Sequence, residues 1–181
     1  MTFPGVSQVL HLAVTDSTQT VARFLAEEGA PHGTLVWADA QTGGRGRMKR
    51  RWKSAPGGLY FSLILRPRFA PSRLAELSLR TAEAAATSLS RQAGIETLIK
   101  PPNDVYAVKN ARARKICGIL AEASGDSRKT DWVALGVGIN VNNAPGLPTA
   151  TSAKAMTGKT WDLPAVLRSF LLEFQRSYAG L

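Results

Sequence analysis

Runs of apolar residues separated by polar turns predict six strands along the chain. The stretch LYFSLIL at residues 59–65 is the clearest, because a short apolar run that stops just before a proline is typical of a buried strand. The other strands are expected at residues 8–14, 34–38, 105–106, 115–124 and 131–142. Between the last two, the polar stretch GDSRKT predicts a hairpin with a longer loop.

Three further segments carry apolar residues at intervals of three or four and predict amphipathic helices. They lie between residues 17 and 29, between residues 72 and 94, and after Pro164. The positions on their buried faces are Val21, Phe24 and Leu25 in the first helix, Leu74, Leu77, Thr81, Ala85 and Leu89 in the second, and Val166, Leu167, Phe170, Leu171, Phe174 and Tyr178 in the third. The pattern predicts an α+β fold, a mixed β-sheet with helices packed mainly on one face and the other face left for a ligand.

Length and composition predict one globular domain over residues 1–181. With 44% hydrophobic and 20% charged residues, the chain has enough apolar side chains for a core and too little net polarity for a disordered chain. One cysteine excludes an internal disulfide, and two histidines with that thiol exclude a Cys/His structural zinc site. No secretion signal and no run of eighteen apolar residues is found. We therefore expect a protein of the reducing cytoplasm without membrane contact.

The net charge is strongly positive. Twenty-three Lys and Arg residues against 13 Asp and Glu give +10, which commonly serves nucleic acid, phosphate or an acidic protein, although a basic surface without a partner is also frequent. The segment QTGGRGRMKRRWKSAPGG at residues 41–58 is too rich in glycine and charge for a regular element, so we expect a long exposed loop. In it, glycines leave backbone N–H groups unobstructed beside Arg45 and Arg47 and allow the loop to wrap an anion. The same composition is also found in solvated turns and in non-specific RNA contacts.

Three more segments carry side chains suited to a ligand. Residues 100–104, Lys-Pro-Pro-Asn-Asp, place a cation, an amide and a carboxylate on a stiff bend that suits a nucleotide with Mg²⁺, and that is also an ordinary turn. Lys115 opens the strand KICGILAE, in which Gly118 leaves room for a ligand or another backbone. Gly136 and Gly138 share one face of a strand and leave it bare, either for tight packing or for a flat ligand.

In their order along the chain, these segments resemble the catalytic domain of biotin protein ligases, the biotin–[acetyl-CoA-carboxylase] ligase family. The resemblance runs from about Val14 to Asn142 and rests on Ser17-Thr18, Gln41 with GGRGR, Trp52, PGGLYFSLILRP, KPPNDV, KICGILAE and GVGINVN. It implies a fold like that of class II aminoacyl-tRNA synthetases and biotin ligases. It also implies a two-step reaction, in which biotin and ATP give biotinyl-5′-AMP and pyrophosphate, and a lysine of the biotin carboxyl carrier protein of acetyl-CoA carboxylase then takes the biotinyl group.

The resemblance also implies roles for individual residues. Biotin binding is implied for Ser17, Thr18, Gln19, Gln41, Arg45, Gly46, Arg47, Lys115, Gly118, Gly136 and Gly138. Nucleotide binding is implied for Trp52, Asn103, Asp104, Lys115 and Asn140, with Asp104 on the metal side and Asn140 also at the floor of the pocket. ATP and Mg²⁺ are the implied cofactors. Lys115, Arg45 and Arg47 are the catalytic candidates, because together with Mg²⁺ they neutralise the charge that grows where a carboxylate meets the α-phosphate.

The chain departs from the family pattern at several positions. Gln19 replaces an Asn near biotin, Pro101 replaces a Trp on the nucleotide side, and Met48-Lys49 stands where the loop commonly has Arg-Gly. Residues 1–181 leave no room for the N-terminal DNA-binding domain or the small C-terminal β-barrel of many members, so no repressor role and no specific DNA binding are expected. The sequence leaves a homodimer open.

Two alternatives are also compatible with the sequence. A lipoate or octanoate ligase or transferase shares the fold, but Gln41 with GGRGR favours biotin. A basic nucleic-acid-binding module would use Trp52 and the cations Arg45, Arg47, Lys49, Arg50 and Arg51 as a charged stacking surface. That module explains the net charge but not KPPND, KICGIL or GVGIN. We interpret His11 and His32 as structural, because no nucleophile pattern such as Gly-x-Ser-x-Gly accompanies them.

Overall fold

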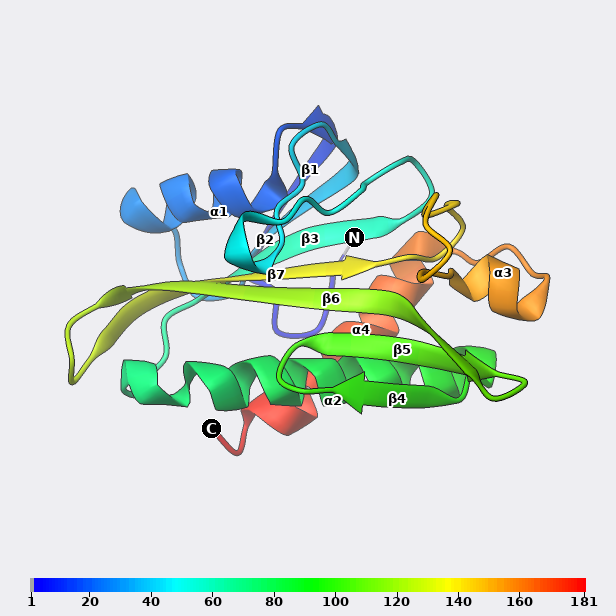
Figure 1. Ribbon diagram of the computed structural model, residues 1–181. Helices are drawn as coiled ribbons and strands as arrows, with labels where there is room; N and C mark the ends of the chain where they lie inside the picture. The colour runs from blue at the N-terminus through cyan, green and yellow to red at the C-terminus, as the bar shows by residue number, and fades with distance from the viewer. Residues whose placement is uncertain (1) are drawn as a thin grey trace.

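A mixed β-sheet of seven strands forms the middle of the molecule, in the order β1-β2-β3-β7-β6-β5-β4. The computed structural model describes residues 2–181 (Figure 1). Its strands are β1 (Gln8–Thr15), β2 (Thr34–Gln41), β3 (Leu59–Leu65), β4 (Thr97–Lys100), β5 (Asp104–Lys109), β6 (Arg112–Gly125) and β7 (Thr130–Ile139). β1 and β2 are parallel, and the other neighbouring strands are antiparallel. The predicted mixed sheet is therefore confirmed.

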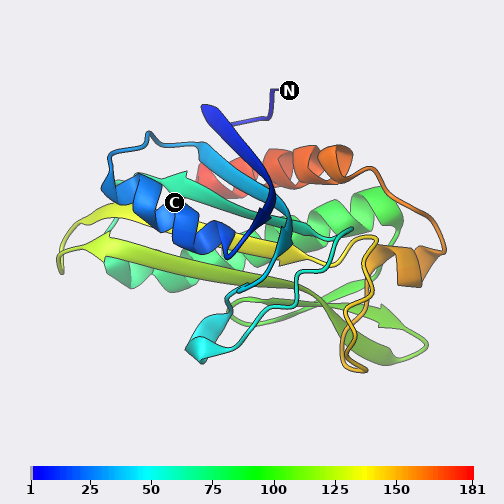
Figure 2. The ribbon, with the colours of Figure 1, turned by 90° about the horizontal axis from the view of Figure 1, so that it is seen from above.

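Helices cover the two faces of this sheet unequally. α2 (Leu74–Ala93) and α4 (Leu163–Tyr178) lie together on one face, and α1 (Thr18–Glu27) lies on the opposite face (Figures 1 and 2). The short α3 (Ala153–Thr157) lies at one end of the sheet, and two 3-10 turns, η1 (Arg47–Lys49) and η2 (Pro71–Arg73), complete the fold. Within the described residues, no helix combines the length and the apolar character needed to cross a bilayer.

The alternation of side chains along β3 shows why two layers form. Phe61 points to the two-helix layer, where its ring packs edge-on against Phe170 of α4 with the ring centroids 5.2 Å apart. Ile64 points to the other face and packs with Ala22 and Ala26 of α1. Because α1 covers only part of its face, the remainder of that face is free to carry a site, as the sequence pattern predicts.

The structure corrects the predicted elements at several points. Residues 97–100 form the strand β4, and β5 is six residues long where only residues 105–106 were expected. The strand predicted at residues 131–142 ends at Ile139. The helix α3 escaped prediction, because five residues are too few to show a period of 3.6.

The buried face of α1 is also different from the prediction. Phe24 is 61% exposed, whereas the small residues Ala22 and Ala26 are buried against the sheet. An alanine face lets the helix lie close to β3 and β7. The apolar spacing thus predicted the helix correctly but assigned Phe24 to the wrong face.

Candidate active site

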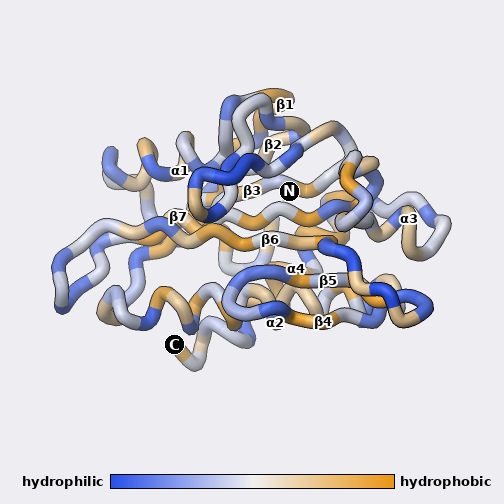
Figure 3. Tube along the Cα trace, in the orientation of Figure 1, coloured by the Kyte–Doolittle hydropathy of each residue, from blue (hydrophilic) through white to orange (hydrophobic). Residues whose placement is uncertain are grey.

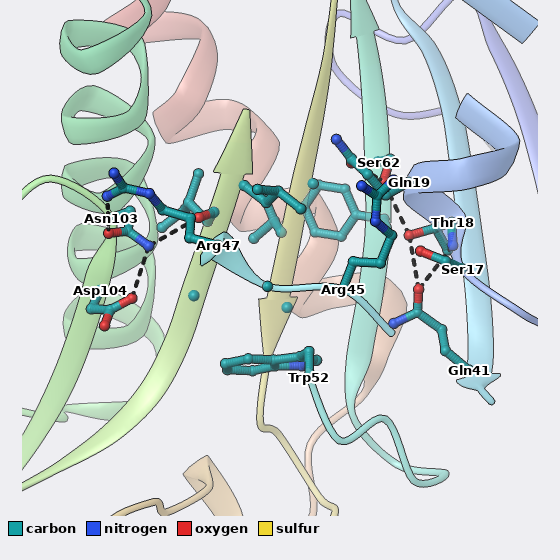
Figure 4. Close-up of a pocket in the computed structure, with 18 of the residues that line it drawn as sticks. Ser17, Thr18, Gln19, Gln41, Arg45, Arg47, Trp52, Ser62, Asn103 and Asp104 are labelled. Carbon is teal, nitrogen blue, oxygen red and sulfur yellow. Dashed lines mark hydrogen bonds between the residues drawn. The ribbon is translucent and has the colours of Figure 1, made fainter. Parts of the chain in front are cut away.

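Amide and hydroxyl groups form one end of a cavity beside α1 (Figure 4). The backbone N–H of Thr18 donates to Gln41 Oε1 at 2.8 Å. The Ser62 hydroxyl donates to Gln19 Oε1 at 3.0 Å and lies 3.0 Å from the Thr18 hydroxyl. Gln19 Nε2 donates to the carbonyl of Ala134 at 2.9 Å. This end is therefore neutral and polar, and its groups hold one another in place.

Two serines complete this neutral end. The hydroxyl oxygen of Ser17 is buried and has no hydrogen-bond partner among residues 2–181, although a buried hydroxyl without a partner is costly. It is therefore available to a ligand. Ser62, which is fully buried in β3, was not predicted as a site residue. The signal for it was present, because it is the only residue of LYFSLIL with a small polar side chain.

Glycines of β6 and β7 form the floor of the cavity, and the indole of Trp52 lies on them. Gly118 and Gly138 face each other across the two strands. A Cβ at Gly138 would lie 2.5 Å from Trp52 Nε1, and a Cβ at Gly118 would lie 2.9 Å from Trp52 Cζ3. At Gly136, a Cβ would lie 2.5 Å from Gln19 Oε1. The predicted bare face of the strand is confirmed, and it is bare because Trp52 and Gln19 need the space.

With Trp52 on the glycine floor, the remaining cavity is small and has a volume of about 60 Å³. Sites for small molecules usually have volumes of roughly 300 Å³ or more. A ligand of that size must therefore displace the Trp52 indole from the glycine floor.

Charged side chains form the other end of the cavity. Lys115 Nζ lies 2.8 Å from Asp104 Oδ1, and Asn103 Nδ2 donates to the same oxygen at 3.0 Å. Arg47 Nη1 donates to Asn103 Oδ1 at 2.9 Å and so connects the loop to the turn that precedes β5 (Figure 4). Lys115 Nζ also lies 5.4 Å from the centroid of the Trp52 ring. The cations of this end thus each have a polar or acidic partner within the protein.

The loop over residues 41–58 is hydrophilic along much of its length (Figure 3) and has more structure than predicted. Arg45 and Arg51 form a β-bridge, and η1 is a single 3-10 turn where no regular element was expected. Met48 and Lys49 have φ angles of 55° and 61°, in the left-handed region that favours glycine. Backbone strain therefore lies at Met48 and Lys49, which stand where the loop of biotin protein ligases commonly has Arg-Gly.

The structure brings nearly all the predicted site residues to one cavity. Its lining includes Ser17, Thr18, Gln19, Gln41, Arg45, Gly46, Arg47, Trp52, Asn103, Asp104, Lys115, Gly118, Gly136 and Gly138. Phe61, Ser62, Ile119, Leu120 and Val137 also line it and were not predicted.

Asn140 is the exception, because it does not line this cavity and so does not form part of its glycine floor. Its predicted role in nucleotide binding stays a prediction. It lines a neighbouring cavity of about 370 Å³, which shares Trp52, Asn103, Asp104 and Lys115 with the first. Its side chain is buried, and Oδ1 accepts a hydrogen bond from Asn143 Nδ2 at 3.0 Å. Asn140 therefore lies beyond the charged end of the glycine floor.

The cysteine and the histidines do not form a nucleophilic centre. Burial raises the pKa of the Cys117 thiol, which keeps the thiol protonated and unreactive near neutral pH. His11 lies 2.7 Å from Asp39 on the surface, and burial lowers the pKa of His32. Neither histidine lines the cavity.

Asp104 fits the metal side of a nucleotide site. Within residues 2–181, no group of three or more His, Cys, Asp or Glu side chains is placed to hold a metal ion. Mg²⁺ does not need such a group, because it is usually bound by one or two carboxylates together with substrate phosphates and water. Asp104 lies where the two cavities meet and offers one such carboxylate.

Comparison with known proteins agrees with this geometry. A sequence model of the Biotin/lipoate A/B protein ligase family matches residues 11–140. The chain belongs to this family. The match contains both ends of the cavity and the loop between them.

Individual relatives carry more specific names. The chain is 40% identical over 172 residues to the bifunctional ligase/repressor BirA of Bacillus subtilis, in an alignment that covers 91% of this chain and 52% of that protein. It is 36% identical over 155 residues to the biotin–[acetyl-CoA-carboxylase] ligase of Paracoccus denitrificans, covering 82% of this chain and 62% of that protein. The chain thus spans little more than half the length of these relatives.

Solved structures support the fold. The biotin protein ligase from Aquifex aeolicus in complex with biotin and ATP superimposes with a TM-score of 0.79 at 33% identity, over 96% of this chain and 71% of that chain. The Leishmania major biotin protein ligase in complex with biotinyl-5-AMP gives a TM-score of 0.78 at 22% identity, which supports the fold alone. The predicted biotin-ligase-like fold class is therefore confirmed.

Proposed function

We propose that the protein activates biotin with ATP to biotinyl-5′-AMP and pyrophosphate, and then transfers the biotinyl group to a lysine of a biotin carboxyl carrier protein. The observation that carries this proposal is the two-ended cavity, neutral and polar at one end and cationic at the other. Biotin has the matching shape, with a ureido group that donates and accepts hydrogen bonds and a carboxylate at the end of its side chain. The names of the relatives support the same chemistry.

The neutral end suits the ureido head of biotin. Thr18, Gln41 and Ser17 offer hydroxyl and amide groups there, and Gln19 and Ser62 hold the wall behind them. A site built to form hydrogen bonds rejects an apolar group strongly, because the site's own buried polar atoms would lose their partners. An octanoyl chain has no groups to satisfy this end, and we therefore favour biotin over lipoate or octanoate.

At the charged end, the carboxylate of biotin would attack the α-phosphorus of ATP. A C–O–P bond forms, and the bond from the α-phosphorus to the pyrophosphate oxygen breaks. Lys115, Arg45 and Arg47 would bind the anionic oxygens that otherwise repel one another. When bound, Mg²⁺ would hold the phosphates and neutralise part of their charge, with Asp104 as its protein ligand.

In the second step, the amine of the carrier lysine attacks the biotinyl carbonyl, AMP leaves, and the amine loses its proton. The mixed anhydride would react with water if it were exposed, so the loop over residues 41–58 would shield it until the lysine arrives. Trp52, once displaced from the floor, is well placed to stack on the adenine beside the neighbouring cavity.

Biotin-dependent exchange of labelled pyrophosphate into ATP tests the first step. We expect exchange with biotin and Mg²⁺ and almost none with lipoate or octanoate. Labelling of a biotin carboxyl carrier domain, lost when its acceptor lysine is replaced by arginine, tests the second step. Equal exchange with lipoate would overturn the choice of biotin, and absence of exchange with every acid would overturn the ligase.

A further inference from the structure

The glycine-rich loop has an acidic partner outside itself. Residues 41–58 contain six cations, Arg45, Arg47, Lys49, Arg50, Arg51 and Lys53, and no Asp or Glu. Within the described chain, one of these six forms an ion pair, between Arg45 Nη2 and Glu122 Oε1 at 2.8 Å. The sequence motifs indicate no role for Glu122.

Glu122 is fixed to the body of the molecule. It lies on β6 in register with Ala134 of β7, two residues after Leu120, which lines the cavity. Its side chain is only 25% exposed, and its second oxygen, Oε2, is buried without a hydrogen-bond partner among residues 2–181. The free oxygen allows a second bond from the Arg45 fork, and such a bidentate pair is stronger than a single contact.

The same carboxylate connects the loop to α1. Arg23 Nη1 lies 3.9 Å from Glu122 Oε1, and Arg23 Nη2 lies 4.0 Å from Glu27 Oε1. α1 begins at Thr18, in the neutral end of the cavity. Glu122 therefore lies between the element that forms the neutral end and the loop that brings the cations.

We propose that Glu122 is a positioning residue for Arg45, and that this ion pair holds the loop across the cavity so that the loop's other groups, Arg47 and Trp52, meet the ligand. The inference rests on the proposed function. Glu122 acts through Arg45 and does not itself bind the ligand, since a carboxylate would repel the anions. Arg45 has five N–H groups, so one or two bonds to Glu122 leave others for the ligand.

The same geometry also allows the opposite relation, in which Glu122 and the ligand compete for Arg45. If Glu122 competed with the ligand for Arg45, removing its charge would strengthen ligand binding. If Glu122 positions Arg45, removing its charge makes the binding-competent loop less populated, and the apparent affinity falls by that fraction. The turnover at saturation then changes little, because bound ligand restores the closed loop.

Glu122→Gln, Arg45→Ala and the double variant separate these relations. We expect Glu122→Gln to raise the KM for biotin in pyrophosphate exchange about 5- to 10-fold, the range typical for loss of one charged partner, with kcat within about threefold of the wild type. In the Arg45→Ala background, the same substitution should add less than about twofold. Glu27→Gln is the matched control, because it removes the other acidic partner of Arg23 and leaves Glu122 and Arg45 in place, and its KM should be unchanged.

A second readout does not require activity. Trypsin should cut Glu122→Gln within residues 45–51 several-fold faster than it cuts the wild type or Glu27→Gln, while far-UV circular dichroism shows that all of them are folded. A lower KM in Glu122→Gln, an unchanged KM and cleavage rate, or an undiminished effect in the Arg45→Ala background would each overturn the proposal. If the wild type shows no exchange but the cleavage rates differ as expected, the proposed function fails and the link between Glu122 and the loop stands.

Discussion

The two ends of the cavity are built in different ways. At the neutral end, Thr18, Gln19 and Ser62 are at most 4% exposed and form hydrogen bonds among themselves and with the sheet. At the charged end, Lys115 is 29% exposed and is paired with Asp104 of β5, and in the loop above the cavity Arg45 is 38% exposed and is paired with Glu122 of β6. The first end is a fixed wall, whereas the second is a set of charges that are paired within the protein and that, in the proposed function, would exchange these partners for the ligand's anions.

This difference indicates how recognition and chemistry are divided. A preformed neutral wall can select a ligand by its hydrogen-bonding groups without reorganisation. In the proposed function, the protein's own carboxylates neutralise Arg45 and Lys115 until an anion arrives, and the glycine-rich loop gives Arg45 and Arg47 the freedom to move. Substitutions at the charged end should therefore affect turnover most, and those at the wall or the floor should affect ligand binding.

Lys115→Ala is expected to have the largest effect. Lys115 lies on the strand β6 at the junction of the two cavities, paired with Asp104. Loss of one electrostatic donor to a developing charge typically costs about 10²- to 10³-fold in rate. Single-turnover formation of biotinyl-5′-AMP measures this rate. Lys129→Ala, which removes an exposed lysine from the β6–β7 hairpin, is the control and should be silent. A loss below threefold in a folded Lys115→Ala variant would make the lysine structural.

Gly138→Ala tests the floor between the two ends. The new Cβ would lie 2.5 Å from Trp52 Nε1, so the indole must shift. Because the ligand takes the place of the indole on the floor in the proposed function, the new methyl group would also displace the bound ligand. A misplacement of about 1 Å can cost roughly 10²-fold, and we expect a loss approaching that in kcat/KM for ATP. Gly180→Ala, where a Cβ meets no atom closer than 3.5 Å, is the matched control. Wild-type kinetics in Gly138→Ala would show that Trp52 adapts without cost.

Limited proteolysis compares the loop with the wall directly. An ordered loop is opposed by the repulsion among its like charges and by the backbone entropy of its glycines. Bound biotinyl-5′-AMP can offset both costs by pairing with Arg45 and Arg47. Trypsin should cut within residues 45–51 before other sites, and biotin with ATP should slow that cleavage several-fold. Biotin alone should protect partially, since it lacks the phosphate. Equal cleavage with adenylate demonstrably bound would remove Arg45 and Arg47 from the site.

Lys49→Gly should have the smallest effect. Lys49 has a φ of 61°, in a region of backbone conformation that costs a residue with a side chain about 1–2 kcal/mol. Glycine avoids this cost, but it also makes the unfolded chain more flexible, which offsets part of the gain in stability. We expect the free energy of unfolding to rise by about 0.5–1 kcal/mol in urea titrations. Lys53→Gly, at a position without a positive φ, should lower it instead. If Lys49→Gly lowered the free energy of unfolding as much as Lys53→Gly does, the backbone at Lys49 would not be strained.

The sequence predicted those parts of the molecule in which local pattern and chemistry agree. The strand at 59–65, the glycine face at Gly136 and Gly138, and the helix that ends before Gly94 all follow from spacing and turn residues. Most of the site followed from the resemblance, because its residues lie in short motifs. Ser62 and Glu122 escaped prediction, since their importance lies in their contacts with Gln19 of α1 and with Arg45 of the loop, both far away in the sequence. The polar side chain of Ser62 in an apolar strand was the one local signal.

Mass spectrometry of the protein after incubation with biotin, ATP and Mg²⁺ tests most directly whether the two ends hold the two halves of one ligand. The mixed anhydride joins the group that the neutral wall selects to the phosphate that the cations bind. We expect biotinyl-5′-AMP to remain with the wild-type protein after gel filtration, in an amount approaching one per chain, and to be almost absent with Lys115→Ala. Unchanged biotin and ATP, with no adenylate on a folded wild-type protein, would contradict the proposed ligase.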